Sequence, residues 1–230
     1  MTSEPPPYPR VPHLFAADER TRDDLVLSAE ERELFLAQPV AVEEKLDGAN
    51  VMLWLGPGGS VRSSGRSGAG ALDRAGQLGR LRAWVAERTD LLRAVLERDR
   101  VLYAEWLFLT HTVHYSRLPD LLVGTDLHEN GAGFLSADDR DEVLEGAGLA
   151  PPPRLFGGAL GGEERLLSLF GRSAFGDEPA EGLVLRRERD GRLLGRAKAL
   201  RPGFVRISDE EWQTGGRGRN AVAEGTPLTR

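Results

Sequence analysis

The segment VEEKLDGANVMLWL, residues 42–55, places charged side chains inside a strand-like apolar run. Lys45 and Asp47 stand two positions apart, so on a strand they would point to the same face. Residues 40–42 and 51–55 are predicted to form the two arms of a core hairpin, with EKLDGAN at its tip. Burying charges is costly, so a charged tip of this kind requires either partners or a function.

Composition limits the classes of protein that this chain can represent. It has 230 residues, of which 40% are hydrophobic, enough for one substantial domain or one domain with a small appendage. The net charge of −6 excludes a generally basic nucleic-acid coat, although a local basic groove remains open. The lack of cysteine excludes disulfides, thiolate metal sites and cysteine nucleophiles. No apolar run reaches the roughly 20 residues of a membrane span, and no signal peptide is evident, so we expect a soluble cytoplasmic protein without membrane contact.

Hydrophobic periodicity and capping signals predict alternating helices and strands. Ser28 opens a capping box for a short helix that ends near Gln38. Apolar positions at helical spacing predict helix over residues 71–98, with a break at Thr89 and Asp90. The tail after Arg217 is Gly-rich and polar and is expected to be loose. Further helices are predicted over residues 136–147 and 163–170, and further strands over residues 60–64, 101–109, 121–127, 181–189 and 193–200.

Ionisable side chains also interrupt or open other apolar strands: Glu105 in VLYAEWLFL, Lys198 in LLGRAKAL and Glu181 at the start of EGLVLR. One interpretation is structural, with ion pairs between Lys45 and Glu105 and between Lys198 and Glu181. The other is chemical, with Lys45 as a nucleophile whose pKa is lowered by burial or by a neighbouring cation. The residues alone leave both interpretations open.

In the chemical interpretation the surrounding residues have plausible tasks. Gly48 permits a tight turn with positive φ and lets backbone amides approach a ligand. Asp47 and Asn50 would fix either a ribose or the turn itself. Carboxylates such as Glu105 and Glu181 suit an oxygen-ligated metal or a ribose hydroxyl. Cationic groups on one strand face, Arg196 and Lys198, suit phosphate oxygens.

These residues stand in motifs that resemble a known superfamily, the covalent nucleotidyltransferases: ATP-dependent DNA and RNA ligases and mRNA capping enzymes. The signature Lys-x-Asp-Gly-x-Asn matches residues 45–50. Four later motifs follow in the family's order, and together they span residues 42–201. They are Ser64-Gly65-Arg66, Tyr103-Ala104-Glu105-Trp106, Glu181-Gly182-Leu183-Val184 and Arg196-Ala197-Lys198. Residues 8–14 and 111–129 are similar to features of small RNA-ligase-domain proteins.

The resemblance implies an α+β fold, a nucleotidyltransferase (ligase adenylation) domain with mainly antiparallel sheets flanked by helices around a nucleotide cleft. It would occupy residues 1–205, with residues 206–230 as a C-terminal tail and no appended OB domain. The implied activity is that of an ATP-dependent RNA ligase. Lys45 would form lysyl-AMP, pass AMP to an RNA 5′-phosphate and seal that end to a 3′-hydroxyl. A nucleotide- or RNA-binding module without ligation, a DNA ligase and a capping guanylyltransferase remain alternatives.

The resemblance also implies roles for individual residues. Mg²⁺ or Mn²⁺ would be supported by Glu181 and Glu105. The α-phosphate of ATP would contact Lys198 and Arg196, the ribose would contact Glu105 and Arg66, and adenine would contact Glu44. RNA ends are the expected partners, with a repair protein as a further candidate.

Two positions depart from the family pattern. The final motif has Arg196 where lysine is usual, and arginine differs from lysine in geometry. The strand that usually carries an aromatic to stack on adenine has Thr125 before Asp126. A preference for ATP over GTP is therefore left open. His111 and His114 have a metal-ligand spacing, but without cysteine or an evident third ligand they predict no zinc site.

Overall fold

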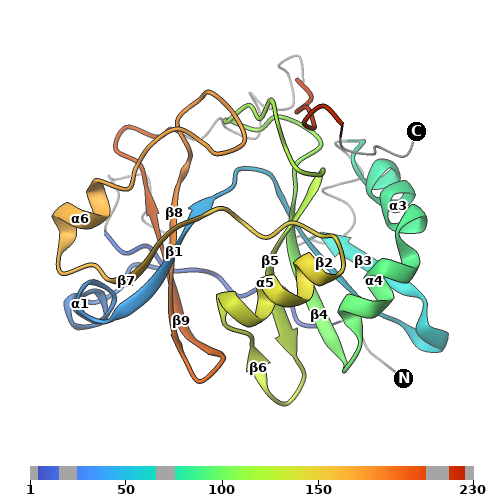
Figure 1. Cartoon of the computed structure of the whole chain (residues 1–230), viewed down its shortest axis with the longest axis horizontal. Helices are drawn as coiled ribbons and strands as arrows, with labels where there is room; N and C mark the ends of the chain where they lie inside the picture. Colours follow the sequence, from blue (N-terminus) through green and yellow to red (C-terminus); the bar gives the residue numbers. More distant parts are fainter. Residues whose placement is uncertain (1–4, 16–24, 66–75, 206–217, 226–230) are drawn as a thin grey trace.

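The computed structural model describes residues 5–15, 25–65, 76–205 and 218–225. Two antiparallel sheets lie next to each other (Figure 1), one with strand order β7-β1-β8-β9 and one with strand order β3-β2-β4-β5-β6. The predicted α+β class with mainly antiparallel sheets is confirmed. The first sheet contains β1 (Pro39–Lys45), β7 (Arg154–Ala159), β8 (Gly182–Arg189) and β9 (Arg192–Leu200). The second contains β2 (Ala49–Leu55), β3 (Val61–Gly65), β4 (Arg100–Trp106), β5 (Leu122–Glu129) and β6 (Gly133–Phe134).

Helices cover the outer sides of the two sheets (Figure 1). The helix α1 (Ala29–Ala37) and the short α6 (Glu163–Leu167) accompany the first sheet, whereas α3 (Leu78–Glu87) and α4 (Thr89–Leu96) pack on the second. The helix α5 (Ala137–Gly146) packs on β5, and a short 3-10 turn, η2 (Pro57–Gly59), joins β2 to β3. None of the helices in these described ranges has the length and apolar character needed to cross a membrane.

Local sequence signals predicted several element boundaries correctly. The capping box of α1 is present: the Glu31 amide donates to the Ser28 hydroxyl, and the Ser28 amide donates to the Glu31 carboxylate. The long helical region is divided at Arg88, one residue before the predicted break. Residues 71–75 of that prediction lie outside the described residues. Strand β7 was not predicted. It is an edge strand whose residues are exposed or half-exposed, so its sequence does not need the apolar pattern that identifies a buried strand.

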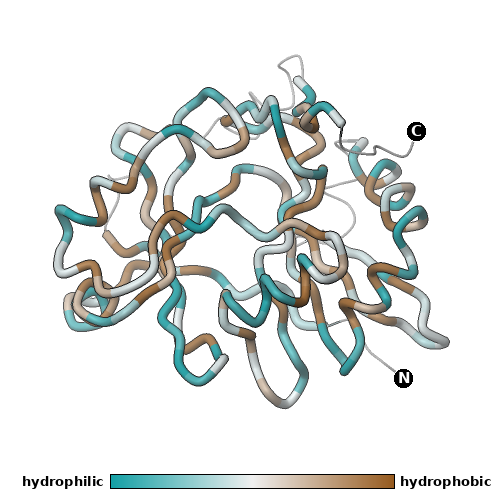
Figure 2. The backbone as a smooth tube through the Cα atoms, viewed as in Figure 1, coloured by the Kyte–Doolittle hydropathy of each residue, from teal (hydrophilic) through white to brown (hydrophobic). Residues whose placement is uncertain are grey.

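The predicted hairpin around EKLDGAN is wrong, because its two arms belong to different sheets. Strand β1 pairs with β7 and β8, and β2 pairs with β3 and β4. The apolar residues of each arm explain the separation: Val40 and Val42 pack in the core of the first sheet, and Val51 and Leu53 in the core of the second. The EKLDGAN segment therefore connects the two sheets and their separate cores. Figure 2 shows hydrophobic stretches along the strands on both sides of it.

The tail is not loose where it is described. Residues 218–223 bond to the segment that follows β4 and to residues 115–118, through amides and carbonyls such as Ala221 N to Tyr115 O at 2.8 Å. The buried Asn220 side chain accepts from the Tyr115 amide and donates to the carbonyls of Leu107 and Leu109. The Gly-rich, polar composition predicted a loose tail. Composition cannot show that one asparagine in it satisfies several buried backbone groups, and this contact holds the tail in place.

Candidate active site

Lys45 is the last residue of β1, and its ε-amine is paired with a carboxylate that stands just before the neighbouring strand β8. Nζ lies 2.7 Å from Glu181 Oε2, with 25% of the lysine side chain exposed and 7% of the glutamate side chain. The register places Lys45 opposite Gly182, so Glu181, just before β8, is beside it. The sequence had suggested Glu105 as the ion-pair partner of Lys45, and the direct partner is Glu181 instead.

The pKa of Lys45 is raised, which contradicts the sequence-based expectation. Burial alone lowers the pKa of this amine, but the negative charges of Glu181, Glu105 and Asp47 outweigh burial and raise it above its ordinary value. In this arrangement carboxylates surround the amine. Lys45 therefore rests as an ammonium, and it must lose a proton before it can act as a nucleophile.

Glu105 lies on β4, in the second sheet, and faces the same cluster. Its Oε1 accepts a hydrogen bond from the Gly48 amide at 3.0 Å. Burial raises the pKa of Glu105 to about 7, with Glu181 and Asp47 adding to the rise and Lys45 opposing it. Because this carboxyl titrates near neutrality, it can exchange a proton in the pH range where the protein would work.

Gly48 is required for a reason other than the predicted one, because its φ is not positive. A Cβ at this position would lie 2.7 Å from Leu107 Cδ2 and 2.7 Å from the Trp106 carbonyl oxygen. The glycine is therefore needed for the close approach of the β1–β2 crossing to the end of β4. That approach is what allows the Gly48 amide to reach Glu105.

Asp47 does not share a strand face with Lys45, because β1 ends at Lys45. Its buried carboxylate accepts hydrogen bonds from the backbone amides of Thr112, at 2.6 Å, and Val113, at 2.9 Å. Its own amide donates to the Tyr115 hydroxyl at 2.8 Å. Asp47 was expected to fix either a ribose or the turn itself, and these contacts support a role in fixing the local backbone. Asn50, on β2, is placed opposite Glu105 by the strand register.

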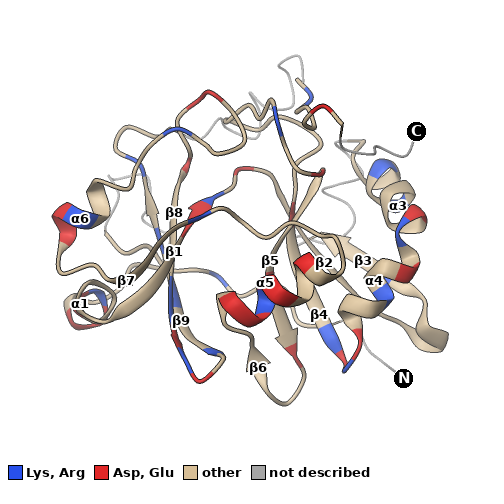
Figure 3. Cartoon of the chain, viewed as in Figure 1, with Lys and Arg blue, Asp and Glu red and all other residues tan. Residues whose placement is uncertain are grey.

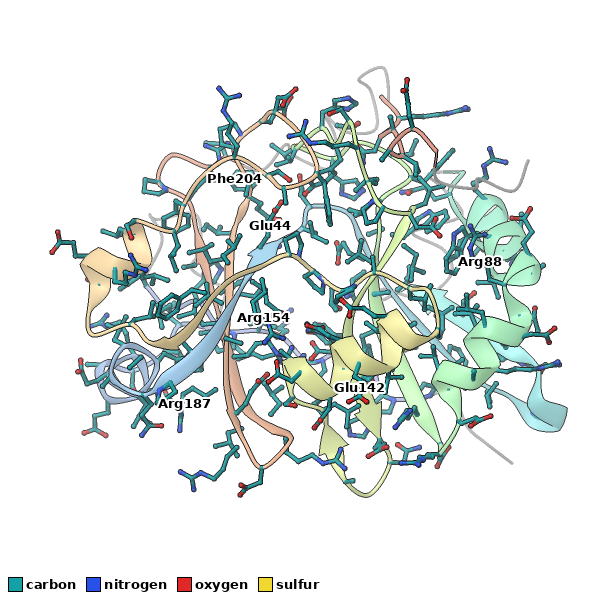
Figure 4. The ribbon with its side chains drawn as sticks, in the orientation of Figure 1. Glu44, Arg88, Glu142, Arg154, Arg187 and Phe204 are labelled. Atoms are coloured by element: carbon teal, nitrogen blue, oxygen red, sulfur yellow. The ribbon has the colours of Figure 1, made fainter. Side chains whose placement is uncertain are left out.

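Glu44 precedes the lysine and is buried near the end of β1 (Figure 4). Its carboxylate accepts hydrogen bonds from the Ser173 hydroxyl and from the Ala174 amide, the latter at 2.8 Å. Burial raises the pKa of Glu44, and these two hydrogen bonds oppose the rise. The side chain proposed for adenine therefore anchors the segment around residue 173 in this structure.

Lys198 and Arg196 lie on β9, two strands away from β1. The register aligns Lys198 with Val184 and Glu43, and Arg196 with Arg186, which puts both side chains on one face of the sheet. Lys45 belongs to the same face, because it is two positions from Glu43. The chain contains two lysines, and both are in this arrangement. Arg66, the remaining ribose candidate, lies outside the described residues.

Arg196 is nearly buried and is held by protein groups. Its guanidinium pairs with Asp126 and donates to the Tyr8 hydroxyl. Its central carbon lies 4.5 Å from the centroid of the Tyr8 ring and 4.3 Å from that of Phe134. Thr125, at the position where an aromatic was expected, donates from its hydroxyl to the Tyr103 carbonyl at 3.0 Å.

An ionic network beneath the site was missed by sequence reasoning. Asp126 pairs with Arg186 at 2.6 Å as well as with Arg196, which ties β5 of the second sheet to β8 and β9 of the first. The fully buried Arg140, on α5, pairs with Glu43 on β1. Arg154 on β7 reaches Asp141 of α5 at 2.7 Å, and Figure 4 labels Arg154 beside this helix. The sequence did contain a signal for part of this network, because Asp126 and Arg186 are charged residues within the apolar segments LLVGTDL and EGLVLRR.

The charged helices α3 and α4 have the character of solvent-exposed helices. In Figure 3, α3 and α4 carry acidic and basic residues interspersed, as the sequence analysis favours for an exposed helix face without a dedicated ligand. No cluster of three or more His, Cys, Asp or Glu among residues 5–15, 25–65, 76–205 and 218–225 could hold a metal ion unaided. His111 and His114 accordingly form no such cluster.

Comparison with known proteins agrees with the motifs. The sequence profile described as RNA ligase matches residues 38–200, which is most of the chain. The chain belongs to the RNA ligase family. No curated protein sequence matches this family member.

Solved structures similar to this RNA ligase family member are those of a Naegleria gruberi RNA ligase. A point variant solved with ATP and Mn is 18% identical, with a TM-score of 0.53, over 88% of this chain and 63% of that one. Another variant, solved with AMP and Mn, is 20% identical with a TM-score of 0.51, over 74% and 51% of the two chains. The chain thus spans about half to two thirds of the Naegleria structures, and the likeness establishes a shared nucleotidyltransferase fold.

Proposed function

We propose that the chain is the adenylation domain of an ATP-dependent RNA ligase acting in the cytoplasm, with residues 1–205 as the domain and residues 206–230 as its tail. The observation that carries the proposal is the contact of 2.7 Å between Lys45 Nζ and Glu181. It lies in a cluster to which β1, β4 and the start of β8 each contribute one ionisable group. Family membership and the similar Naegleria RNA ligase structures, solved with ATP or AMP and Mn, support it further.

In the first step, the neutral amine of Lys45 attacks the α-phosphorus of ATP. A P–N bond forms, the bond to the β-phosphate oxygen breaks, and pyrophosphate leaves. In the second step, an RNA 5′-phosphate oxygen attacks the phosphorus of the bound AMP, a P–O bond forms, and the P–N bond breaks and returns the amine of Lys45. In the third, a 3′-hydroxyl attacks that phosphate, a phosphodiester bond forms and AMP leaves. The Lys45 ammonium must first release a proton, and a cation near it would favour that release by lowering the pKa of the amine.

A divalent cation fits the residues present. Mg²⁺ and Mn²⁺ favour oxygen ligands, and Mg²⁺ is usually bound by one or two carboxylates together with substrate phosphates. Glu181 and Glu105 provide such carboxylates, and the lack of a protein cage of three or more acidic groups or histidines in the described part of the chain agrees with a shared site. The cation would neutralise charge on the phosphates during transfer.

The other residues divide into two groups. Lys198 would contact the α-phosphate, and Asn50 and Arg66 the ribose. Asp47 and Glu44 have their carboxylates bonded to backbone amides, so we propose that they shape the site. Removing the amine of Lys198 should lower the rate of adenylylation by roughly 10²–10³, the usual cost of one preorganised contact. The RNA ends would be the partners, and a repair protein that prepares them a further one.

The test is incubation of the protein with α-labelled ATP and Mg²⁺ or Mn²⁺, followed by denaturing gel and intact mass. The wild type should gain an acid-labile label of one AMP, and Lys45→Ala should gain none. ATP bound without label would favour a binding module over a ligase. Labelling by GTP in place of ATP would favour a capping enzyme. Sealing of nicked DNA but not nicked RNA would favour a DNA ligase.

A further inference from the structure

The segment from Pro6 to Leu14 crosses from one sheet to the other, and we call it the N-terminal strap. At its beginning, the Pro6 carbonyl accepts a hydrogen bond from the Tyr103 hydroxyl of β4 at 2.9 Å. At its end, the Pro12 carbonyl accepts from the Lys198 amide at 2.8 Å, and the Leu14 amide donates to the Lys198 carbonyl at 2.8 Å. Both backbone groups of Lys198 are thus held by the strap.

The middle of the strap inserts Tyr8 between the two sheets. Its ring centroid lies 4.9 Å from that of Tyr103 and 6.4 Å from that of Phe134, to which the ring is nearly perpendicular at 86°. Its hydroxyl donates to Asp126 and accepts from Arg196. The strap therefore contacts both members of the last sequence motif: Lys198 through the backbone and Arg196 through a side chain.

Charge states fix the direction of these hydrogen bonds. Burial raises the pKa of the Tyr8 hydroxyl well above its ordinary value, and the Asp126 charge adds to the rise. Burial also tends to raise the pKa of Asp126, but the guanidinium groups of Arg186 and Arg196 lower it strongly. Tyr8 therefore remains a donor, and Asp126 remains an anion that accepts from Tyr8, Arg186 and Arg196.

Arg196 is poorly placed to serve as a phosphate ligand. Its side chain is 7% exposed, its guanidinium pairs with a buried carboxylate, and two aromatic rings lie against it. Turning it toward a phosphate would leave the Asp126 charge with one partner fewer in a buried site, which is costly. The planar guanidinium group of Arg196 stacks on two rings and donates hydrogen bonds to two oxygens. A lysine ammonium cannot make this set of contacts equally well.

We propose that the N-terminal strap positions the β9 side of the adenylation site, that Tyr8 and Arg196 are its positioning residues, and that Lys198 is the β9 residue that contacts phosphate. This rests on the proposed function and assigns Arg196 a task different from the phosphate contact implied by the resemblance. The strap fixes the place of Lys198 along the strand, and the Tyr8–Asp126–Arg196 contacts hold the strand against β5.

The test is the single-turnover rate of Lys45 adenylylation as a function of ATP concentration, for the wild type, Tyr8→Phe, Arg196→Lys and the double variant. Tyr8→Phe keeps the ring and removes the two hydroxyl contacts. We expect the maximal rate to fall roughly 10- to 100-fold in Arg196→Lys, as for a misplaced catalytic group, and to fall in Tyr8→Phe. The ATP concentration for half-maximal rate should stay nearly unchanged in both. The double variant should be no slower than Arg196→Lys, because the two residues act through one contact.

A matched control is Arg187→Lys, an arginine on β8 that Figure 4 labels; its guanidinium lies over the Phe35 ring and donates to the Gln38 side chain. It should label like the wild type. Circular dichroism and thermal midpoints identify any variant that fails to fold, and if Arg196→Lys does so, the ATP series on Tyr8→Phe decides alone.

Two results would overturn the inference alone while leaving the proposed function intact. One is wild-type behaviour of Tyr8→Phe. The other is a raised ATP requirement with an unchanged maximal rate in Arg196→Lys, as for a phosphate ligand. A wild type that takes no label would overturn the proposed function itself, and the strap inference with it.

Discussion

The ε-amine of Lys45, at the end of β1, lies 2.7 Å from the carboxylate of Glu181, which stands just before β8 and 136 positions away in the sequence. The pair explains why the pKa of Lys45 is raised when burial by itself would lower it. It also means that the amine is held in its protonated form, which is not a nucleophile.

Replacing Glu181 with glutamine should lower the pKa of Lys45, because the negative charge that acts most strongly on the amine disappears while the shape of the side chain remains. At a fixed pH below that pKa, a larger fraction of the amine is then neutral, and acetic anhydride should acetylate Lys45 severalfold faster. The chain has two lysines, so mass spectrometry of proteolytic peptides reports Lys45 directly, with Lys198 as a second position in the same sample.

Glu142→Gln is the matched control for this experiment, since it removes an exposed carboxylate on α5 (Figure 4). It should leave acetylation of Lys45 unchanged. Equal acetylation of Lys45 in wild type and Glu181→Gln would show that the ion pair does not govern the proton on this amine.

The stability of the protein should depend on pH through Glu105. Burial raises the pKa of this carboxyl in the folded protein to about 7, above its ordinary value of 4.5. The folded state therefore binds the proton more tightly, so the stabilisation is complete below about pH 4.5 and is lost as the pH rises through about 7. Glu105→Gln should remove this loss, and its free energy of unfolding relative to wild type should improve between pH 5 and pH 8 by at most about 3 kcal/mol.

Urea denaturation of both proteins at the two pH values measures this difference. Glu97→Gln, an exposed carboxylate after α4, should show the same pH dependence as the wild type. A constant difference between Glu105→Gln and wild type at pH 5 and pH 8 would contradict the assignment of a neutral-range pKa to Glu105.

Gly48→Ala should destabilise the fold by about 1–3 kcal/mol, the usual cost of overpacking. The new methyl group would lie 2.7 Å from the Trp106 carbonyl oxygen, and this backbone atom cannot move without distorting β4. Gly79→Ala in α3 is the comparison, because nothing lies within 4 Å of its Cβ and alanine favours helix. Thermal denaturation should show a lower midpoint for the first variant and an unchanged or higher one for the second.

Asp47→Ala should cost about 2–3 kcal/mol, because it leaves the part-buried amide of Thr112 and the buried amide of Val113 without their acceptor. Asp47→Asn keeps one carbonyl oxygen and should cost less. Amide hydrogen exchange offers a local readout, since protection at residues 112 and 113 should fall in Asp47→Ala and survive partly in Asp47→Asn. Unchanged protection in both variants would mean that other contacts hold this segment.

Part of the site was predictable because some signals are local. The ordered motifs placed Lys45, Glu105, Glu181 and Lys198 on the ends or interiors of strands, and a charge in an apolar strand identified each of them. The same signal is present at Asp126 and Arg186, but their pairing joins segments 60 positions apart and has no local trace in the sequence. Tyr8 had no such signal, since a tyrosine in a proline-rich segment looks like an extended surface residue.

The sequence by itself determined the fold class and most element boundaries, and it supplied the candidate site residues, because periodicity, capping and motif spacing act over a few residues. Only the tertiary structure decided that the EKLDGAN arms enter separate sheets, that carboxylates raise the pKa of Lys45, and that Asp47 turns to a loop 65 positions away. The physical reason is that strand pairing and burial are set by packing between distant segments. The charge state and direction of a side chain follow from the neighbours that this packing brings to it.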